Sequence, residues 1–125
     1  MSRLKEYLKI ENGKGRIKMG LHSVTFDDHG HVIIYVPSLN ISAYGDTFEE
    51  AQEMLEVALD DFCETLYSLP EPQRTEELKK YGWNRNPLFK KKFEISDSFV
   101  DKEGLLKNFE LSDDTKVEET FLMIA

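Results

Sequence analysis

The side chains best suited to hold a metal ion lie close together in one short stretch of the chain. They are His22, Asp27, Asp28, His29 and His31. Imidazole and carboxylate groups are common metal ligands. However, Asp and Gly are favoured in hairpin turns for backbone reasons alone, and alternate residues of a strand point to opposite faces of a sheet. Because this alternation separates the donors, we assign no metal and no cofactor to the stretch.

A second set of candidates is a row of acids at three- and four-residue spacing, Glu49, Glu53, Glu56 and Asp60. Such carboxylates can ligate Mg²⁺ or act as a general acid and base. Those roles need the acids gathered in a cleft with perturbed pKa values. Here the spacing puts them on the helix face opposite the apolar side chains. The sequence also has no glycine-rich phosphate loop, no Gly-x-Ser-x-Gly and no His-Glu-x-x-His. It predicts no catalytic residue, and we expect a protein that is not an enzyme.

Lys90, Lys91 and Lys92, flanked by Phe89 and Phe93, form the candidate nucleic-acid patch. Basic residues interleaved with aromatic ones can hold phosphates and stack bases. Lysines on a strand also protect a sheet edge from unwanted pairing. We favour the second interpretation and do not expect nucleic acid as a partner.

The charge distribution is strongly uneven. The net charge is −8, and the segment from Met19 to Gln73 has eleven acids and no Lys or Arg. A field of one sign repels nucleic acid and anionic membrane and attracts a basic partner. An acidic helix face can equally be a solvated surface that keeps a domain soluble. As candidate partner-binding residues we take the acids of the outward helix face: Glu53, Glu56, Asp60, Asp61 and Glu64.

The totals indicate one soluble domain spanning residues 1–125. Of the residues, 40% are apolar and 32% charged, which is ordinary for a globular protein. No apolar run approaches the ~20 residues that cross a bilayer, and the first residues do not read as a signal peptide, so we expect a cytoplasmic protein. The single cysteine, Cys63, excludes an intramolecular disulfide. It falls on the apolar side of the helix, where we expect a buried, inert thiol.

The first half of the chain predicts strands. Alternating apolar and polar residues indicate strands over 16–26, 31–36 and 39–44, connected as an antiparallel meander. The first two are separated by a turn over 27–30, in which Gly30 is best able to take a positive φ. Residues 7–10 fit either another hairpin strand or a short helix.

One long amphipathic helix follows. Thr47 is its predicted N-cap, with Glu50 at the capping-box spacing. Pro70 and Pro72 are expected to end it. The apolar stripe expected to pack on the sheet comprises Phe48, Ala51, Leu55, Ala58, Leu59, Phe62, Cys63 and Leu66.

Beyond the prolines the patterns predict shorter elements. They are a helix over 74–81 ended by Gly82, a strand over 88–95, a helix over 101–109 and a strand over 117–124. Trp83 is expected to anchor its segment to the core. The predicted fold class is therefore α+β: an antiparallel meander of three or more strands packed against one long amphipathic helix, with additional C-terminal helix and strand elements.

The order of these elements, with Pro37-Ser38-Leu39 and Gly45-Asp46-Thr47-Phe48-Glu49-Glu50-Ala51, resembles the HicB-type antitoxin family over about residues 17–83. The resemblance implies a partial ribonuclease H-like fold for this core, with residues 84–125 as an extension. It also implies self-association and the binding and blocking of a small basic, RNA-cleaving toxin of the HicA type. The residues that carry over have structural roles: Pro37, Leu39, Gly45, Asp46, Thr47, Glu50 and Ala51.

This chain departs from the family pattern in two places. Members usually have a Gly-Cys pair after the proline turn, where this chain has Asn40-Ile41-Ser42. Many members also carry a ribbon-helix-helix or helix-turn-helix, and neither pattern occurs over residues 84–125. Two alternatives to a toxin partner stay open. One is an orphan homo-oligomeric scaffold or interaction domain of the same shape, and the other is a DNA-binding transcriptional regulator that uses Lys90 to Lys92.

Overall fold

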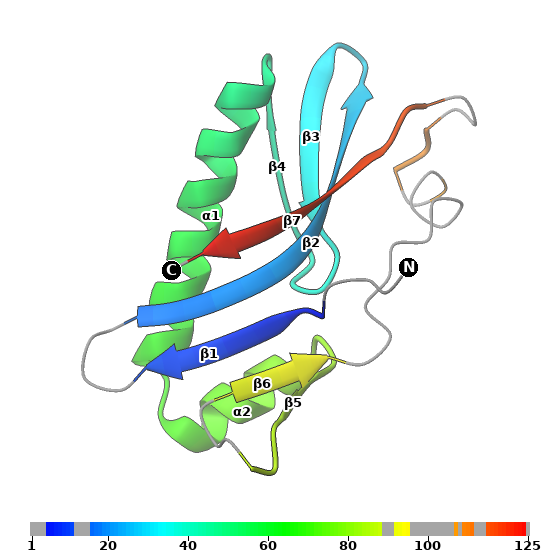
Figure 1. Ribbon diagram of the computed structural model, residues 1–125. Coiled ribbons are helices and arrows are strands. Elements are labelled where there is room, and N and C mark those ends of the chain that lie inside the picture. The colour runs from blue at the N-terminus through cyan, green and yellow to red at the C-terminus, as the bar shows by residue number, and fades with distance from the viewer. Residues whose placement is uncertain are drawn as a thin grey trace.

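Strand β2, Arg16–Asp28, is the strand around which the sheet is built. The computed structural model describes residues 5–11, 16–88, 92–95, 107, 109–111 and 115–124. Within them the fold is α+β, with a seven-stranded sheet in the order β4-β3-β2-β1-β6-β5 and β7 paired to β2 (Figure 1). Every strand pair is antiparallel. This confirms the predicted fold class.

The long β2 has three neighbours. It pairs with β1 (Tyr7–Glu11) up to Gly20 and with β3 (His31–Val36) from Val24 onward. The third neighbour is β7 (Glu118–Ile124), which pairs with β2 from Met19 to Thr25 and so overlaps the ends of both other pairings. Residues 7–10 are therefore a hairpin strand rather than a helix, and the predicted strand at 117–124 is confirmed within one residue.

The first turn of the meander is tighter than the sequence indicated, and the second is longer. His29 and Gly30 both have positive φ, 52° and 85°, as a two-residue hairpin turn of the primed type requires. Asp27 and Asp28, predicted in the turn, therefore belong to β2. The next strand, β4, is Ile41–Gly45. Leu39, predicted to start it, lies in the turn instead, where its N–H donates to the carbonyl of Val36 at 3.3 Å.

Helix α1, Phe48–Ser68, begins as predicted. The N–H of Glu50 donates to Oγ1 of Thr47 at 3.1 Å, which satisfies one free donor of the first turn. The buried residues of α1 are Ala51, Leu55, Leu59 and Leu66. Phe48 was placed in this stripe, but 45% of it stays exposed, because it is the first helical residue and stands at the end of the packed face.

Helix α2, Glu71–Lys79, starts three residues earlier than predicted. Pro70 is its N-cap residue and Pro72 lies in its first turn. A proline is tolerated there because the first N–H groups of a helix have no intrahelical partner. Arg74 joins the two helices: its guanidinium donates to the carbonyls of Leu66, Tyr67 and Leu69 at 3.1–3.2 Å. These bonds add donors for the carbonyl groups at the end of α1, where the last turn has no intrahelical partners.

The C-terminal part of the described chain extends the sheet. Helix α2 ends at Lys79, two residues earlier than predicted, and Gly82, with φ 92°, lies in the turn that follows it. Strand β5, Trp83–Arg85, was not predicted, and β6, Lys92–Ile95, is shorter than the predicted strand at 88–95. Leu88 precedes β6 and is 83% exposed, while residues 89–91 lie outside the described part. The predicted helix at 101–109 also falls largely outside it.

Two apolar clusters cover the two faces of the sheet. The larger lies between the sheet and the helices, and Trp83 is fully buried in it, as predicted. The smaller lies on the opposite face around Val24 and Phe26, with Phe109, Leu111 and Val117 packed against it. None of the described helices has the length and apolarity to span a membrane.

A buried polar group links four segments. Oε2 of Glu6, whose residue is 4% exposed, accepts hydrogen bonds from the N–H of His22 at 3.0 Å and from Oγ of Ser38 at 2.7 Å. The carbonyl of Ser38 in turn accepts from Nε1 of Trp83 at 2.9 Å. Buried polar groups are costly unless satisfied, so this network fixes β1, β2, the β3–β4 turn and β5 relative to one another.

The contact between β4 and α1 explains one residue of the Gly45-to-Ala51 motif. A Cβ at Gly45 would lie 2.6 Å from the backbone nitrogen of Ala51 and 2.8 Å from Cβ of Glu50. Real Cβ atoms do not approach backbone this closely. Gly45 is therefore required by the close approach of strand to helix.

We expect Gly45→Ala to lower the free energy of unfolding by about 2 kcal/mol or more, because the helix backbone must shift to admit the methyl group. Urea denaturation measures this. Ser42→Ala, on the exposed side of the same strand, is the control and is expected to change stability by less than about 0.5 kcal/mol. Equal stability of the two variants would show that the close contact does not constrain the fold.

Candidate protein-binding surface

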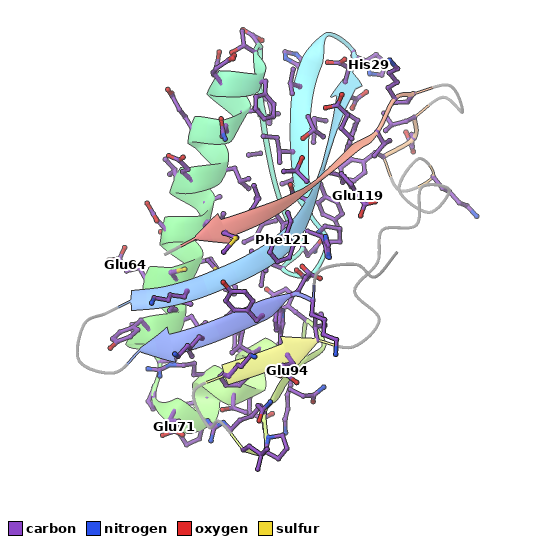
Figure 2. The ribbon with its side chains drawn as sticks, in the orientation of Figure 1. His29, Glu64, Glu71, Glu94, Glu119 and Phe121 are labelled. Atoms are coloured by element: carbon purple, nitrogen blue, oxygen red, sulfur yellow. The ribbon has the colours of Figure 1, made fainter. Side chains whose placement is uncertain are left out.

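The outward face of α1 carries charge of one sign. The helix has seven carboxylates and no Lys, Arg or His, and all seven side chains are exposed. Figure 2 shows Glu64 pointing from α1 away from the sheet. We call this set the acidic face: Glu49, Glu50, Glu53, Glu56, Asp60, Asp61 and Glu64. The five candidate binding residues from the sequence all belong to it.

Nothing in the described part of the chain neutralises the acidic face. The ion pairs among the described residues are Asp28 with His29, Asp46 with His31, Glu71 with Arg85, Glu77 with Lys80 and Glu94 with Lys92. None of them involves a carboxylate of α1. The field of the helix therefore extends into solvent without a paired cation.

Two apolar side chains are exposed among these acids. Met54 is 51% and Val57 61% exposed, and they lie one helical turn apart. Neither residue was predicted as a contact residue, and neither belongs to the apolar stripe predicted from the sequence. Apolar groups inside a charged surface can supply the contact area that charge alone does not.

The five candidate binding residues of α1 border two different grooves or none. Glu56 and Asp60 line a groove of about 380 Å³ between α1 and the end of β7, which we call the α1–β7 groove. Asp61 lines a second groove of about 290 Å³ between α1 and the segment around α2, together with Glu77 and Tyr81. Glu53 and Glu64 line neither groove. The structure thus places the five candidates on one helix face but not in one cleft.

The motif residues lie at the junctions of elements, which supports their structural roles. Pro37 and Leu39 form the β3–β4 turn, and the carbonyl of Pro37 accepts the N–H of Asn40 at 3.2 Å. At the other junction, Oδ1 of Asp46 lies 3.1 Å from Nδ1 of His31. This contact joins the loop before α1 to the start of β3. No local sequence pattern indicates it, because the two residues lie 15 positions apart.

The three histidines considered as metal ligands have separate environments. His22 is buried against Phe121, with ring centroids 5.0 Å apart. His29 is at the hairpin tip beside Asp28, and His31 contacts Asp46. Across the described residues, no three His, Cys, Asp or Glu side chains are grouped so that they could hold a metal ion.

Of the lysine run, only Lys92 lies in the described part of the chain. It begins β6, and its Nζ is 3.8 Å from Oε1 of Glu94. Lys90 and Lys91 fall outside the described residues. The structure therefore does not place the three lysines on one surface.

The chain matches no model of a known protein family, and the searches of curated proteins and of solved structures found no significant match. The resemblance to HicB-type antitoxins therefore stays a prediction from the sequence, based on the ordered motif from Pro37 to Ala51 and on the order of the elements around it.

Cys63 lies beside the acidic face but belongs to the partly buried side of α1. Burial, with a smaller contribution from the charge of Asp60, raises the pKa of its thiol from 9.0 to about 11. Thiolate, not thiol, is the nucleophile. The side chain is therefore unreactive near neutral pH.

We expect iodoacetamide to alkylate Cys63 about 100-fold more slowly in the folded protein than in urea at pH 8, as the difference in thiolate fraction requires. Mass spectrometry of timed samples gives both rates. Because the folded pKa lies above the unfolded one, protonated Cys63 contributes stability below pH 9 that is lost as the pH rises toward 11. Equal alkylation rates in the folded and the unfolded protein would contradict the raised pKa of Cys63.

Proposed function

We propose that this chain is a non-catalytic binding protein whose acidic face docks a small basic protein. The observation that carries the proposal is the set of seven exposed carboxylates on α1, none of them ion-paired within the described residues, with Met54 and Val57 exposed among them. The motif resemblance narrows the proposal to an antitoxin that neutralises a basic, mRNA-cleaving toxin of the HicA type.

The charged and the apolar side chains of α1 contribute differently to binding. Complementary charge speeds encounter and favours a basic partner over others, whereas apolar contacts supply most of the affinity. The carboxylates surround Met54 and Val57. A partner attracted by the carboxylates therefore contacts these two apolar side chains at the same place. The rigid helix holds both sets in one arrangement, which lowers the entropic cost of binding.

The same arrangement gives a physical route to inhibition. A protein that cleaves RNA holds the phosphate backbone with Lys and Arg side chains. A row of carboxylates at three- and four-residue spacing presents anionic oxygens to that basic surface. Occupation of the surface by the acidic face therefore excludes the RNA without any chemical step.

The test is co-expression of this chain with a small basic, RNA-cleaving toxin of the HicA type, whose toxicity to the host cell is measured as loss of growth. We expect the wild-type chain to restore growth and the variant Glu53→Lys, Glu56→Lys, Asp60→Lys and Asp61→Lys to fail, because like charges now meet. Circular dichroism and thermal melting establish that the variant is folded.

A control variant carries the same change in net charge elsewhere on the surface, at Asp27, Glu76, Glu94 and Glu110. These four side chains are exposed and lie outside α1. We expect this control to restore growth as the wild type does. Neutralisation by the α1 variant at wild-type level would overturn the proposal, and so would failure of both variants to the same extent.

A further inference from the structure

The α1–β7 groove runs along an edge of the sheet. Its floor includes Leu122 and Met123, which are consecutive residues of β7. Consecutive strand residues point to opposite faces; Leu122 packs toward the main core, whereas Met123 is 76% exposed. A groove lined by both passes along the edge of β7 rather than over one of its faces.

That edge of β7 is the one without a partner strand. On its other edge Leu122 pairs with Leu21 and Met123 pairs with Gly20, both in β2. In the described part of the chain β7 pairs with no second strand. Alternate residues of β7 therefore direct their N–H and C=O groups to this free edge, which meets the groove at Leu122 and Met123. An extended segment can bond to these groups by adding a strand.

The side chains around the groove define what such a segment must carry. Leu55 and Leu59 of α1 continue the apolar floor, and Glu56 and Asp60 stand at its rim. Neither carboxylate has a cationic partner among the described residues. An apolar floor with an acidic rim is complementary to a segment that combines apolar and basic residues.

We propose that the free edge of β7 binds an extended basic segment of a partner protein as an added strand, with the basic side chains of that segment on Glu56 and Asp60. This inference rests on the proposed function, since it assigns the site on the acidic face that the basic partner occupies. Backbone hydrogen bonds along β7 supply affinity, and the carboxylates of Glu56 and Asp60 favour segments that carry basic side chains.

The probe for this site is an acetylated, amidated seven-residue peptide of alternating lysine and valine, added to the chain of residues 1–125 at low salt. Nuclear magnetic resonance of the backbone amides locates its binding. We expect the peptide to change the amide chemical shifts of Leu122 and Met123. We also expect slower amide hydrogen exchange for alternate residues of β7. β4 and β5 each pair with a single strand among the described residues, so their free edges serve as internal controls. Shifts at those edges instead, or no binding, would overturn the assignment.

Two charge-reversal pairs test the rim. Fluorescence anisotropy with labelled peptide should give an affinity at least about tenfold lower for Glu56→Lys with Asp60→Lys, which is about 1.4 kcal/mol. The matched pair Glu53→Lys with Glu64→Lys makes the same charge change outside the groove, and we expect less than about a threefold effect there.

The outcomes separate this inference from the proposed function. If both charge-reversal pairs weaken peptide binding equally and the β7 amide shifts do not change, the acidic face as a whole binds cations. That result would overturn the groove assignment and leave the proposed function standing. Weakening by neither pair would contradict both.

Discussion

The structure depends on how closely α1 packs against the meander. The backbone of Ala51 lies so near Gly45 that no side chain fits between them, and the stripe of Leu55, Leu59 and Leu66 is buried. Once the stripe is fixed against the sheet, the rotation of the helix is fixed as well. The polar positions of α1 must then face solvent. The direction of the acidic face is thus a consequence of core packing, and it does not depend on ion pairs, since the α1 acids form none with the described residues.

This arrangement carries a local electrostatic cost. Glu49 and Glu50 lie near the positive N-terminal end of the helix dipole, where carboxylates are favourable. Further along, Glu56 with Asp60 and Asp60 with Glu64 are like-charged pairs four residues apart, each destabilising by a few tenths of a kcal/mol. No basic residue occupies the last turn to offset the negative end of the dipole. Burial of the stripe outweighs these terms, and a basic partner would relieve them. The helix is therefore stable through tertiary packing while its exposed face favours bound cationic groups.

The sequence predicted the elements whose signal is local. Alternation over 16–26 and 31–36, the helical stripe after Thr47 and the bulk of Trp83 each led to the observed element or its burial, because the neighbours that decide them are close in the chain or simply apolar. Features set by long-range pairing were missed. The three-residue β5 is a strand only because β6 pairs with it, and β6 is placed by β1. The α1–β7 groove needs Leu122 beside Leu59, 63 residues away, which no local pattern contains. The candidate residues of the acidic face were identified as a helix face, but their division between two grooves could not be.

The central claim is that the acidic face binds through its charge. The most direct measurement is the affinity for the basic partner as a function of salt, from titration calorimetry between about 50 mM and 500 mM sodium chloride, over which the Debye length falls from roughly 14 Å to roughly 4 Å. We expect the association constant to fall by tenfold or more across this range, with its logarithm linear in the logarithm of the salt concentration, and we expect reversal of the α1 acids to remove this dependence. An affinity that is unchanged over the same range would contradict the central claim.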